Sequence, residues 1–113
     1  MRQIEYRFWD KELQKMLYRK PLTYDFYQDS IIPLEFTGFV DNKGNEIFDG
    51  DILSDWTETD EGKVQSNQQV FWSEKYGQWH LDLSMKQDKS FSSPLWKELK
   101  DFDYTVTGNI YEK

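Results

Sequence analysis

The chain has 113 residues, which suits one domain of ordinary size and is too short for two. It has no cysteine, which excludes disulfides, thiolate metal sites and a cysteine nucleophile. No apolar run is long enough to span a membrane, and the first residues lack the apolar segment of a signal peptide. We therefore expect a single soluble, cytoplasmic domain over residues 1–113, without membrane contact.

Aromatic side chains make up 18% of the chain, with five Trp, seven Tyr and eight Phe, and there is no alanine. Alanine is the best helix former, whereas aromatic side chains pack well on the pleated surface of a sheet. The composition therefore predicts a mainly β fold with an aromatic core. Phe8, Trp72 and Trp79 are expected in this core.

Acidic residues are unevenly distributed along the chain. Residues 1–34 carry six basic and five acidic groups, whereas residues 35–113 carry eight basic and sixteen acidic groups. A negative surface repels nucleic-acid phosphates, so direct nucleic-acid binding is disfavoured. The simplest interpretation is a surface charge that aids solubility, and the alternative is a surface that imitates nucleic acid.

The first residues predict a β-hairpin. In residues 3–9, Tyr6 and Phe8 alternate with Glu5 and Arg7, a period of two that places apolar and charged side chains on opposite faces of a strand. Residues 14–18 are predicted as the second strand, and a short helix over 11–19 is the alternative. Residues 20–33, with two prolines, predict an irregular connection that contains a short strand near 23–27.

The centre of the chain predicts two strands joined by a tight turn. Residues 34–40 alternate up to Gly38, where a glycine suggests a bulge. Residues 41–45 form a cluster of turn-forming residues, in which Gly44 is able to take positive φ. The next short strand, Glu46-Ile47-Phe48, leads directly into Asp49-Gly50-Asp51.

The Asp49-Gly50-Asp51 segment predicts a sharp redirection of the chain. Together with Asp55, it offers three carboxylates within seven residues, so a cation site is conceivable. The glycine and the extended neighbours favour a turn instead, in which Gly50 redirects the backbone and Asp49 and Asp51 accept its hydrogen bonds. We therefore expect no metal and no cofactor here.

The next segment predicts an exposed hairpin loop at residues 57–62, because these residues are acidic and polar. Residues 63–72 and 78–83 predict two strands joined by a short turn that contains glycine. Because side chains alternate along a strand, Trp79 is expected to face the core and His80 the solvent.

A short helix is predicted near the C-terminus. Ser93 is expected as its N-cap, with Pro94 at the first helical position and an end near Asp101. Residues 103–111 predict the last strand, interrupted at Gly108-Asn109. Short antiparallel strands, frequent glycine turns and one late helix together predict a partly open SH3-like barrel.

The sequence contains no recognisable catalytic constellation. His80 is the only histidine, so a zinc site would lack a second nitrogen ligand, and no serine lies in a Gly-x-Ser-x-Gly motif. There is also no phosphate-binding glycine loop. We therefore expect no catalytic residues and a protein that is not an enzyme, although a carboxylate pair assembled in space stays open as an alternative.

Exposed aromatic side chains are candidates for partner contacts, because proline-rich peptides bind in the aromatic grooves of SH3-like barrels. Most aromatics of so small a domain are needed in the core. Trp56 lies beside the acidic loop at residues 57–62 and is therefore the aromatic expected to be exposed. We predict Trp56 as a contact with a protein partner.

Four segments, in order along the chain, resemble the YopX family of phage and prophage proteins. Residues 6–10 (YRFWD) resemble its opening F-R-x-W-D, and residues 35–52 (EFTGFVDNKGNEIFDGDI) are similar to its block Q-Y-T-G-L-x-D-K-N-G-K-E-I-Y-E-G-D-I. Residues 70–72 (VFW) match its hydrophobic-x-Trp strand, and residues 106–112 (VTGNIYE) its closing V-I-G-N-I-Y-E. Phe39 and Asp49 depart from the usual leucine and glutamate, and the chain ends slightly earlier than its relatives.

The resemblance implies a phage or prophage origin in a low-GC Gram-positive host and a mostly β fold with a partly opened SH3-like barrel. It implies no activity, because the family is uncharacterised. The positions that carry over are structural: Gly38, Gly44, Asp49, Gly50, Asp51, Gly108 and Asn109 at turns, and Trp9, Phe36, Ile47, Ile52, Trp72 and Ile110 as apolar points.

Three functional hypotheses follow. The first is a non-enzymatic accessory protein that acts by binding another protein, alone or as a homo-oligomer; it predicts an exposed aromatic patch or an unpaired strand edge. The second is an acidic inhibitor that imitates DNA. The third is a small carboxylate-based enzyme, which requires a deep pocket with two convergent carboxylates.

Overall fold

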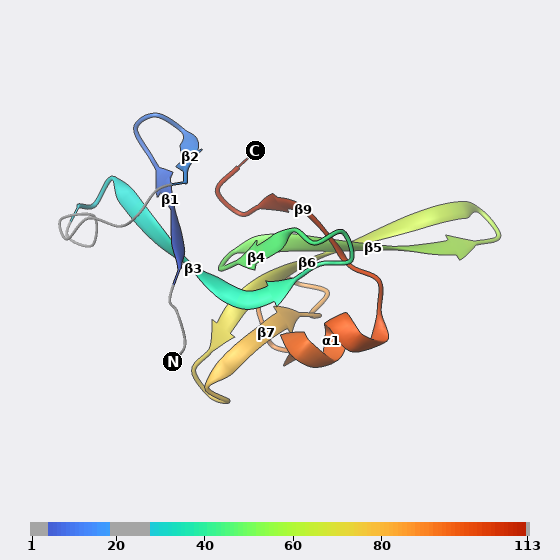
Figure 1. Cartoon of the computed structure of the whole chain (residues 1–113). Coiled ribbons are helices and arrows are strands. Elements are labelled where there is room, and N and C mark those ends of the chain that lie inside the picture. The colour runs from blue at the N-terminus through green and yellow to red at the C-terminus, as the bar shows by residue number, and fades with distance from the viewer. Residues whose placement is uncertain (1–4, 19–27, 113) are drawn as a thin grey trace.

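A computed structural model of the chain describes residues 5–18 and 28–112 (Figure 1). These residues form nine strands and one helix. In chain order they are β1 (Tyr6–Asp10), β2 (Lys15–Leu17), β3 (Ile31–Val40), β4 (Glu46–Phe48), β5 (Asp51–Thr59), β6 (Gly62–Ser73), β7 (Gln78–Asp82), β8 (Ser92–Pro94), α1 (Leu95–Asp101) and β9 (Thr105–Asn109). The short strand predicted near residues 23–27 lies outside the described residues.

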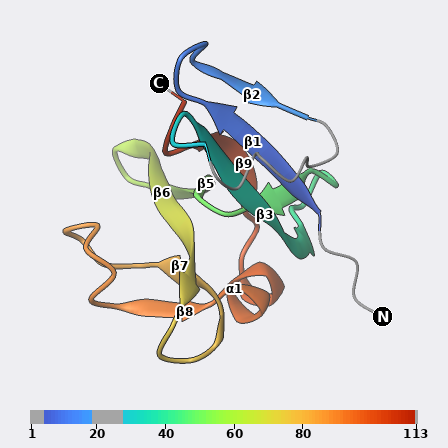
Figure 2. The ribbon, with the colours of Figure 1, turned by 90° about the vertical axis from the view of Figure 1, so that its left-hand side faces the viewer.

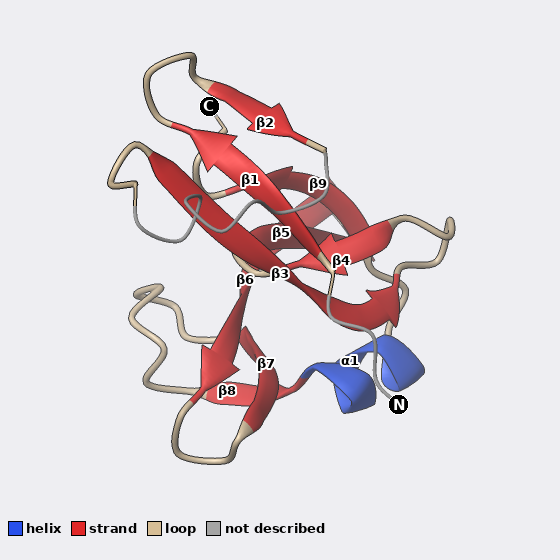
Figure 3. Ribbon diagram, turned by 60° about the vertical axis from the view of Figure 1, so that its left-hand side comes forward, coloured by secondary structure: helices blue, strands red, loops and turns tan. Residues whose placement is uncertain are grey.

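The strands pair into two antiparallel sheets, ordered β2-β1-β3-β4 and β8-β7-β6-β5-β9. One sheet curls into a half-barrel, and α1 packs against β7 and β8 (Figure 3). Figure 2 shows β1 and β3 lying across β9 and β5. The expectation of a mainly β fold, with a partly open barrel and one short late helix, is confirmed.

The main core lies between the five-stranded sheet, β4 and α1. Its buried side chains are Ile47, Leu53, Val70, Trp79, Leu81, Leu95 and Tyr104. Phe8 is also fully buried, so the expectations for Phe8 and Trp79 are confirmed. The expectation for Trp72 is wrong: its side chain is 39% exposed, because it lines a groove that opens to solvent, where its ring meets that of Trp79 edge-on at a centroid distance of 5.2 Å.

The N-terminal hairpin is confirmed, and the helical alternative is excluded. β1 pairs with β2 from Phe8↔Leu17 to Asp10↔Lys15, and the carboxylate of Asp10 accepts the backbone N–H groups of Glu12 and Leu13 in the turn. The prediction that β1 has one charged face is wrong, because Arg7 is buried. Its guanidinium pairs with a buried carboxylate from β5, described below.

The bulge and the turn predicted in the centre of the chain are both confirmed. The β3–β4 register shifts between Phe36 and Val40, around Gly38, which has φ of +89°. In the following turn, Asp41 accepts hydrogen bonds from the backbone N–H groups of Lys43 at 2.9 Å and Asn45 at 2.8 Å. A third N–H, from Val106 at 2.9 Å, ties this turn to β9.

The exposed loop predicted at residues 57–62 is mostly strand. β5 and β6 continue in uninterrupted register up to Thr59↔Gly62, so only Asp60 and Glu61 form the turn. The Thr59 hydroxyl donates to the Gly62 carbonyl at 2.8 Å and helps to close this end. In Figure 1 the two strands extend from the body of the protein as an arm. The polar composition of this segment reflects its exposure to solvent. It does not prevent the backbone from pairing as two strands.

The prediction that His80 faces solvent is wrong. His80 is only 2% exposed, because Tyr76 in the turn before β7, Phe71 of β6 and Ser92 of β8 all lie against its ring. Its Nδ1 lies 2.8 Å from the Ser92 hydroxyl, and its ring stacks on Tyr76 at 5.1 Å. Asp82, on the same face, is also buried and accepts hydrogen bonds from Ser84.

The late helix is confirmed, but its predicted cap is wrong. α1 begins at Leu95, Pro94 is its N-cap without a side-chain hydrogen bond, and Ser93 instead pairs with Leu81 of β7. Ser93 and Pro94, which the capping pattern assigns to the start of the helix, therefore belong to the sheet. β9 runs through Gly108 and Asn109 without the predicted break; its register with β5 shifts one position earlier, at Thr107.

Candidate interaction surface

The Asp49-Gly50-Asp51 turn joins several strands of the fold. Gly50 has φ of +82°, and a Cβ at this position would lie 3.2 Å from Cγ1 of Ile110. The positive φ and the close side chain both require glycine. The backbone N–H of Gly50 donates to the Val70 carbonyl at 3.0 Å, which fixes the turn to β6.

Asp51 lies at the centre of this junction and is fully buried. Its carboxylate accepts hydrogen bonds from the Phe48 backbone N–H at 2.8 Å and from Nδ2 of Asn109 at 3.0 Å, and it forms an ion pair with Arg7. Burial raises the pKa of Asp51, and the bonds from Asn109, Phe48 and Arg7 oppose that rise. These contacts join β1, β4, β5 and β9, so Asp51 acts in the architecture.

The carboxylates near this turn do not converge on a cation. Asp51 is committed to Arg7, and Asp55 accepts the backbone N–H of Trp56 at 2.9 Å on the arm. Burial raises the pKa of Asp49. In residues 5–18 and 28–112 no group of three or more histidine or carboxylate side chains is placed to hold a metal ion.

A groove lined by three tryptophans lies where the two sheets and the helix meet. Its aromatic lining comes from four elements: Phe39 from β3, Trp72 from β6, Trp79 from β7 and Trp96 from α1. The volume of the groove is about 310 Å³. Trp96 is 51% exposed and Trp72 39%. Thr37, Gly77 and Gln78 complete the lining.

The groove combines a fixed floor with exposed walls. Trp79 is buried and belongs to the core cluster, and Phe39 packs against that cluster. Trp72 meets Trp79 edge-on, with an interplanar angle of 77°. The buried Nε1 of Trp79 finds no hydrogen-bond partner among the described residues. A concave apolar site with aromatic walls and few polar groups is typical of binding sites.

Sequence reasoning missed this groove. Trp72 is expected in the core, and Trp56 is the one tryptophan predicted as a partner contact. No pattern in the sequence links Trp72 with Trp96, because the two lie on different elements and only the packing of α1 against β7 brings them to one opening.

Trp56, the predicted partner contact, is 44% exposed and lies on the arm, opposite Gln65. The prediction that it is exposed is confirmed. It does not line the groove, so the structure does not bring Trp56 together with Trp72 and Trp96. Its role in partner binding stays a prediction.

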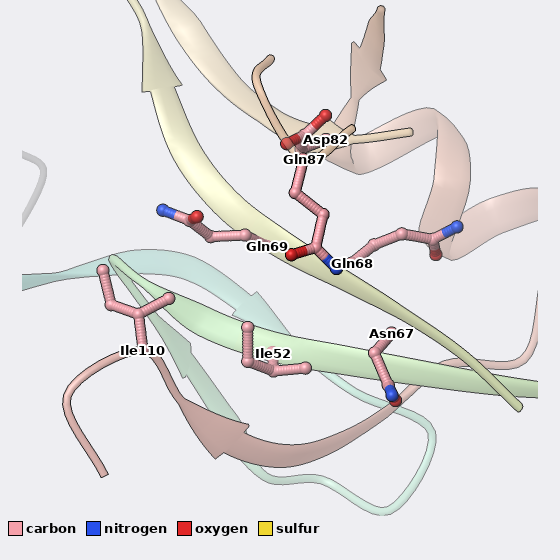
Figure 4. Close-up of a pocket in the computed structure, with 7 residues that line it drawn as sticks. All are labelled: Ile52, Asn67, Gln68, Gln69, Asp82, Gln87 and Ile110. Carbon is pink, nitrogen blue, oxygen red and sulfur yellow. The ribbon is translucent and has the colours of Figure 1, made fainter. Parts of the chain in front are cut away.

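A second, smaller pocket is polar. It measures about 110 Å³ and lies between the base of the arm and the end of β7 (Figure 4). Amide side chains dominate its lining, with Asp82 as its carboxylate. The full lining is Ile52, Asn67, Gln68, Gln69, Asp82, Gln87 and Ile110. Asp82 is bonded to Ser84 and to the backbone N–H of Lys89.

Comparisons place the chain in a known family. No curated protein sequence matches it. A crystal structure of protein EF1440 from Enterococcus faecalis is similar, with a TM-score of 0.70 and 22% sequence identity over 96% of this chain and 94% of that one. This similarity shows a shared fold. None of the helices in the described residues is long and apolar enough to cross a membrane. Residues 21–113 match the family described as YopX protein, and the chain therefore belongs to the YopX family.

Proposed function

We propose that this protein is a cytoplasmic phage or prophage accessory protein that binds a partner protein through the groove formed by Phe39, Trp72, Trp79 and Trp96, alone or as a homo-oligomer. The observation that carries this proposal is the pair of exposed tryptophans, Trp72 and Trp96, on rigid elements around one opening. Tryptophan is the residue most enriched among the energetic centres of protein interfaces.

The occupant that fits this groove is an extended, proline-rich segment. Proline rings stack on flat aromatic side chains, and a polyproline helix loses little conformational entropy on binding. The volume of about 310 Å³ accommodates a few side chains and is too small for a folded domain. Gln78, at the rim, supplies both a hydrogen-bond donor and an acceptor for the backbone of such a segment.

The negative charge of the protein favours proline-rich segments that are basic. The formal net charge is −7, so the protein attracts basic partners over distances of about 8–10 Å at ordinary salt. We therefore infer that the bound segment carries lysine or arginine beside its prolines, and that added salt weakens its binding.

The test is a titration with synthetic peptides. The probe is a ten-residue polyproline peptide flanked by arginines, and its control has the prolines replaced by alternating glycine and serine. Tryptophan fluorescence and amide chemical shifts should respond to the polyproline peptide alone. Trp96→Ala should weaken binding by about tenfold or more, which corresponds to about 1.4 kcal/mol.

Trp56→Ala is the matched control, because it removes a tryptophan of similar exposure outside the groove. If the wild type and Trp96→Ala bind the polyproline peptide equally well, the proposal that the groove is the binding site is wrong. A response to the glycine–serine peptide would also contradict it. If only Trp56→Ala loses binding, the peptide binds at the arm and not at the groove.

The acidic imitation of DNA is the weaker candidate. Part of the acidity is used inside the protein, because several carboxylates of residues 35–113 are buried and hydrogen-bonded: Asp41, Asp51, Asp82 and Glu98. Four of the sixteen acids in residues 35–113 are therefore withdrawn from the surface. A small carboxylate-based enzyme needs two convergent carboxylates, whereas the polar pocket is lined by Asp82 and neutral side chains.

A further inference from the structure

The β5–β6 arm has an open edge. β5 and β6 pair without interruption along the whole arm, whereas β7 pairs with β6 only from Val70 to Ser73 (Figure 1). Within the described part of the chain, residues 62–69 of β6 therefore have β5 as their neighbouring strand on one side and none on the other. Native proteins protect such edges with proline, bulges or charges. This segment has no proline and no bulge, and Lys63 is its one charged residue.

Two hydrogen bonds fix which backbone groups point to the open edge. The Val70 carbonyl accepts the Gly50 N–H on the β5 side, and the Ser73 carbonyl accepts the Gly77 N–H on the β7 side. Backbone groups alternate between the two sides of a strand. The unbroken register therefore directs toward the open edge the N–H and C=O groups of Lys63, Gln65 and Asn67.

A polar network holds this edge in a fixed shape. Ser54, fully buried on β5, donates to Oδ1 of Asn67 at 2.6 Å, and Nε2 of Gln65 donates to the same oxygen at 2.7 Å. The Thr107 hydroxyl lies 2.7 Å from that of Ser54 and connects β9. Because the side chains of Gln65 and Asn67 are already ordered, strand pairing costs them little further entropy.

The polar pocket sets the limit of the open edge. In Figure 4, Gln87 reaches from beyond β7 toward β6, beside Gln68 and Gln69, whereas Asn67 points away from it. A strand added to this edge therefore has free access up to Asn67. The accessible stretch is centred on Gln65.

We propose that a second copy of this chain pairs with this edge, antiparallel, about a two-fold axis at Gln65. In this arrangement Gln65 lies opposite Gln65 of the second copy, and Lys63 opposite Asn67, so outward-pointing backbone groups meet outward-pointing groups in every pair. No like charges face each other, which matters because each copy carries −7. This inference rests on the proposed function, which includes a homo-oligomer, and it locates the interface between the copies at the edge of β6. The aromatic groove stays free in this dimer.

Sedimentation velocity at rising protein concentration, from micromolar to millimolar, tests the pairing. We expect a monomer–dimer equilibrium that added salt strengthens, because screening reduces the repulsion between acidic copies. Amide hydrogen exchange should locate the interface. With rising concentration, protection should increase at the amides of Lys63, Gln65 and Asn67 and stay constant at Val64 and Ser66, whose N–H groups bond β5.

Two variants at one position separate backbone pairing from side-chain effects. Gln65→Pro removes the outward N–H, whereas Gln65→Ala removes the same side-chain hydrogen bonds and keeps that N–H. We expect Gln65→Pro to raise the dimer dissociation constant by about tenfold or more relative to Gln65→Ala. Circular dichroism of both variants checks that the fold is retained.

A protein that stays monomeric at every concentration overturns the proposal. So does a dimer without the alternating protection at residues 63–67, or one that both variants weaken equally. Peptide binding at the groove is measured separately, so failure of either proposal leaves the other intact.

Discussion

Arg7 and Asp51, 44 positions apart in the sequence, form a buried ion pair that joins β1 to the turn between β4 and β5. The guanidinium of Arg7 also lies over the ring of Phe48, 4.5 Å from its centroid. Arg7 therefore balances the buried charge of Asp51, which belongs to the family motif, and also packs on the ring of Phe48 in the same motif. The N-terminal sheet is anchored to the rest of the protein at this point.

Removing one partner of this pair should be costly, because the other charge stays buried. We expect Arg7→Ala to lower the free energy of unfolding by about 3–5 kcal/mol at neutral pH, measured by denaturant titration. Burial already raises the pKa of Asp51, and loss of Arg7 raises it further. A carboxyl with a raised folded-state pKa gains stability as pH falls through that value, so the loss should shrink in acid. Lys15→Ala, at an exposed position of β2, should change stability by about 0.5 kcal/mol or less; an equal loss would contradict the role of the pair.

Gly50→Ala should be more harmful than Gly44→Ala, although the two residues have nearly the same φ, +82° and +83°. Both substitutions force alanine into the left-handed region, at about 1–2 kcal/mol each. At Gly50 the new Cβ also meets Ile110 at 3.2 Å, whereas nothing lies within 4 Å at Gly44. Thermal unfolding should show the larger loss for Gly50→Ala. Equal losses would mean that Ile110 moves aside without cost.

Asp41 should link the stability of the protein to acid. Burial alone would raise its pKa, but N–H groups of Val106, Asn45 and Lys43 outweigh burial and hold the pKa below 3.8. A carboxyl with a lowered folded-state pKa stabilises the fold above the unfolded-state value, and this contribution is lost as pH falls below 3.8 through the folded-state pKa. Asp41→Ala should cost about 1–3 kcal/mol at neutral pH by leaving buried N–H groups unpaired.

Asp41→Asn tests the linkage itself, because it removes the titrating group and keeps one acceptor. Its unfolding free energy should fall less steeply below pH 4 than that of the wild type. Asp60→Asn, at the exposed tip of the arm, should leave the acid dependence of the wild type unchanged. An identical slope in Asp41→Asn and the wild type would refute the role of Asp41.

His80 should make the stability depend on pH in a less acidic range than Asp41 does. Burial lowers its pKa below 6.5, so the neutral ring is favoured in the fold. Its contribution is fully present above pH 6.5 and is lost as pH falls from 6.5 to the folded-state pKa, by at most about 1.4 kcal/mol per pH unit. His80→Gln should remove this loss, as measured by urea unfolding at pH 7.5 and pH 5.5. Because the raised pKa values of Asp49 and Asp51 act with the opposite sign, the comparison with the variant is decisive.

Local signals in the sequence determined most turns and strands of this protein. Gly38, Gly44 and Gly50 all have positive φ, at the bulge and the two turns that the sequence predicts, because the absence of Cβ is a property of the residue itself. The alternation of residues 34–40 and 78–82 is likewise encoded locally and gives strands. The family motif, built on Asp49-Gly50-Asp51, is readable for the same reason.

What covers each strand is decided by tertiary structure, because side-chain alternation defines two faces without saying which is buried. His80 is buried against Tyr76 and Ser92, and Arg7 by its pairing with Asp51, which lies 44 positions away in the sequence. Ser93 fits a helix cap in sequence but pairs with β7 in space. Trp72 and Trp96 form one groove only because α1 packs against β7. The sequence alone determined the turns, the mainly β class and the family, and long-range packing decided which side chains are available to a partner.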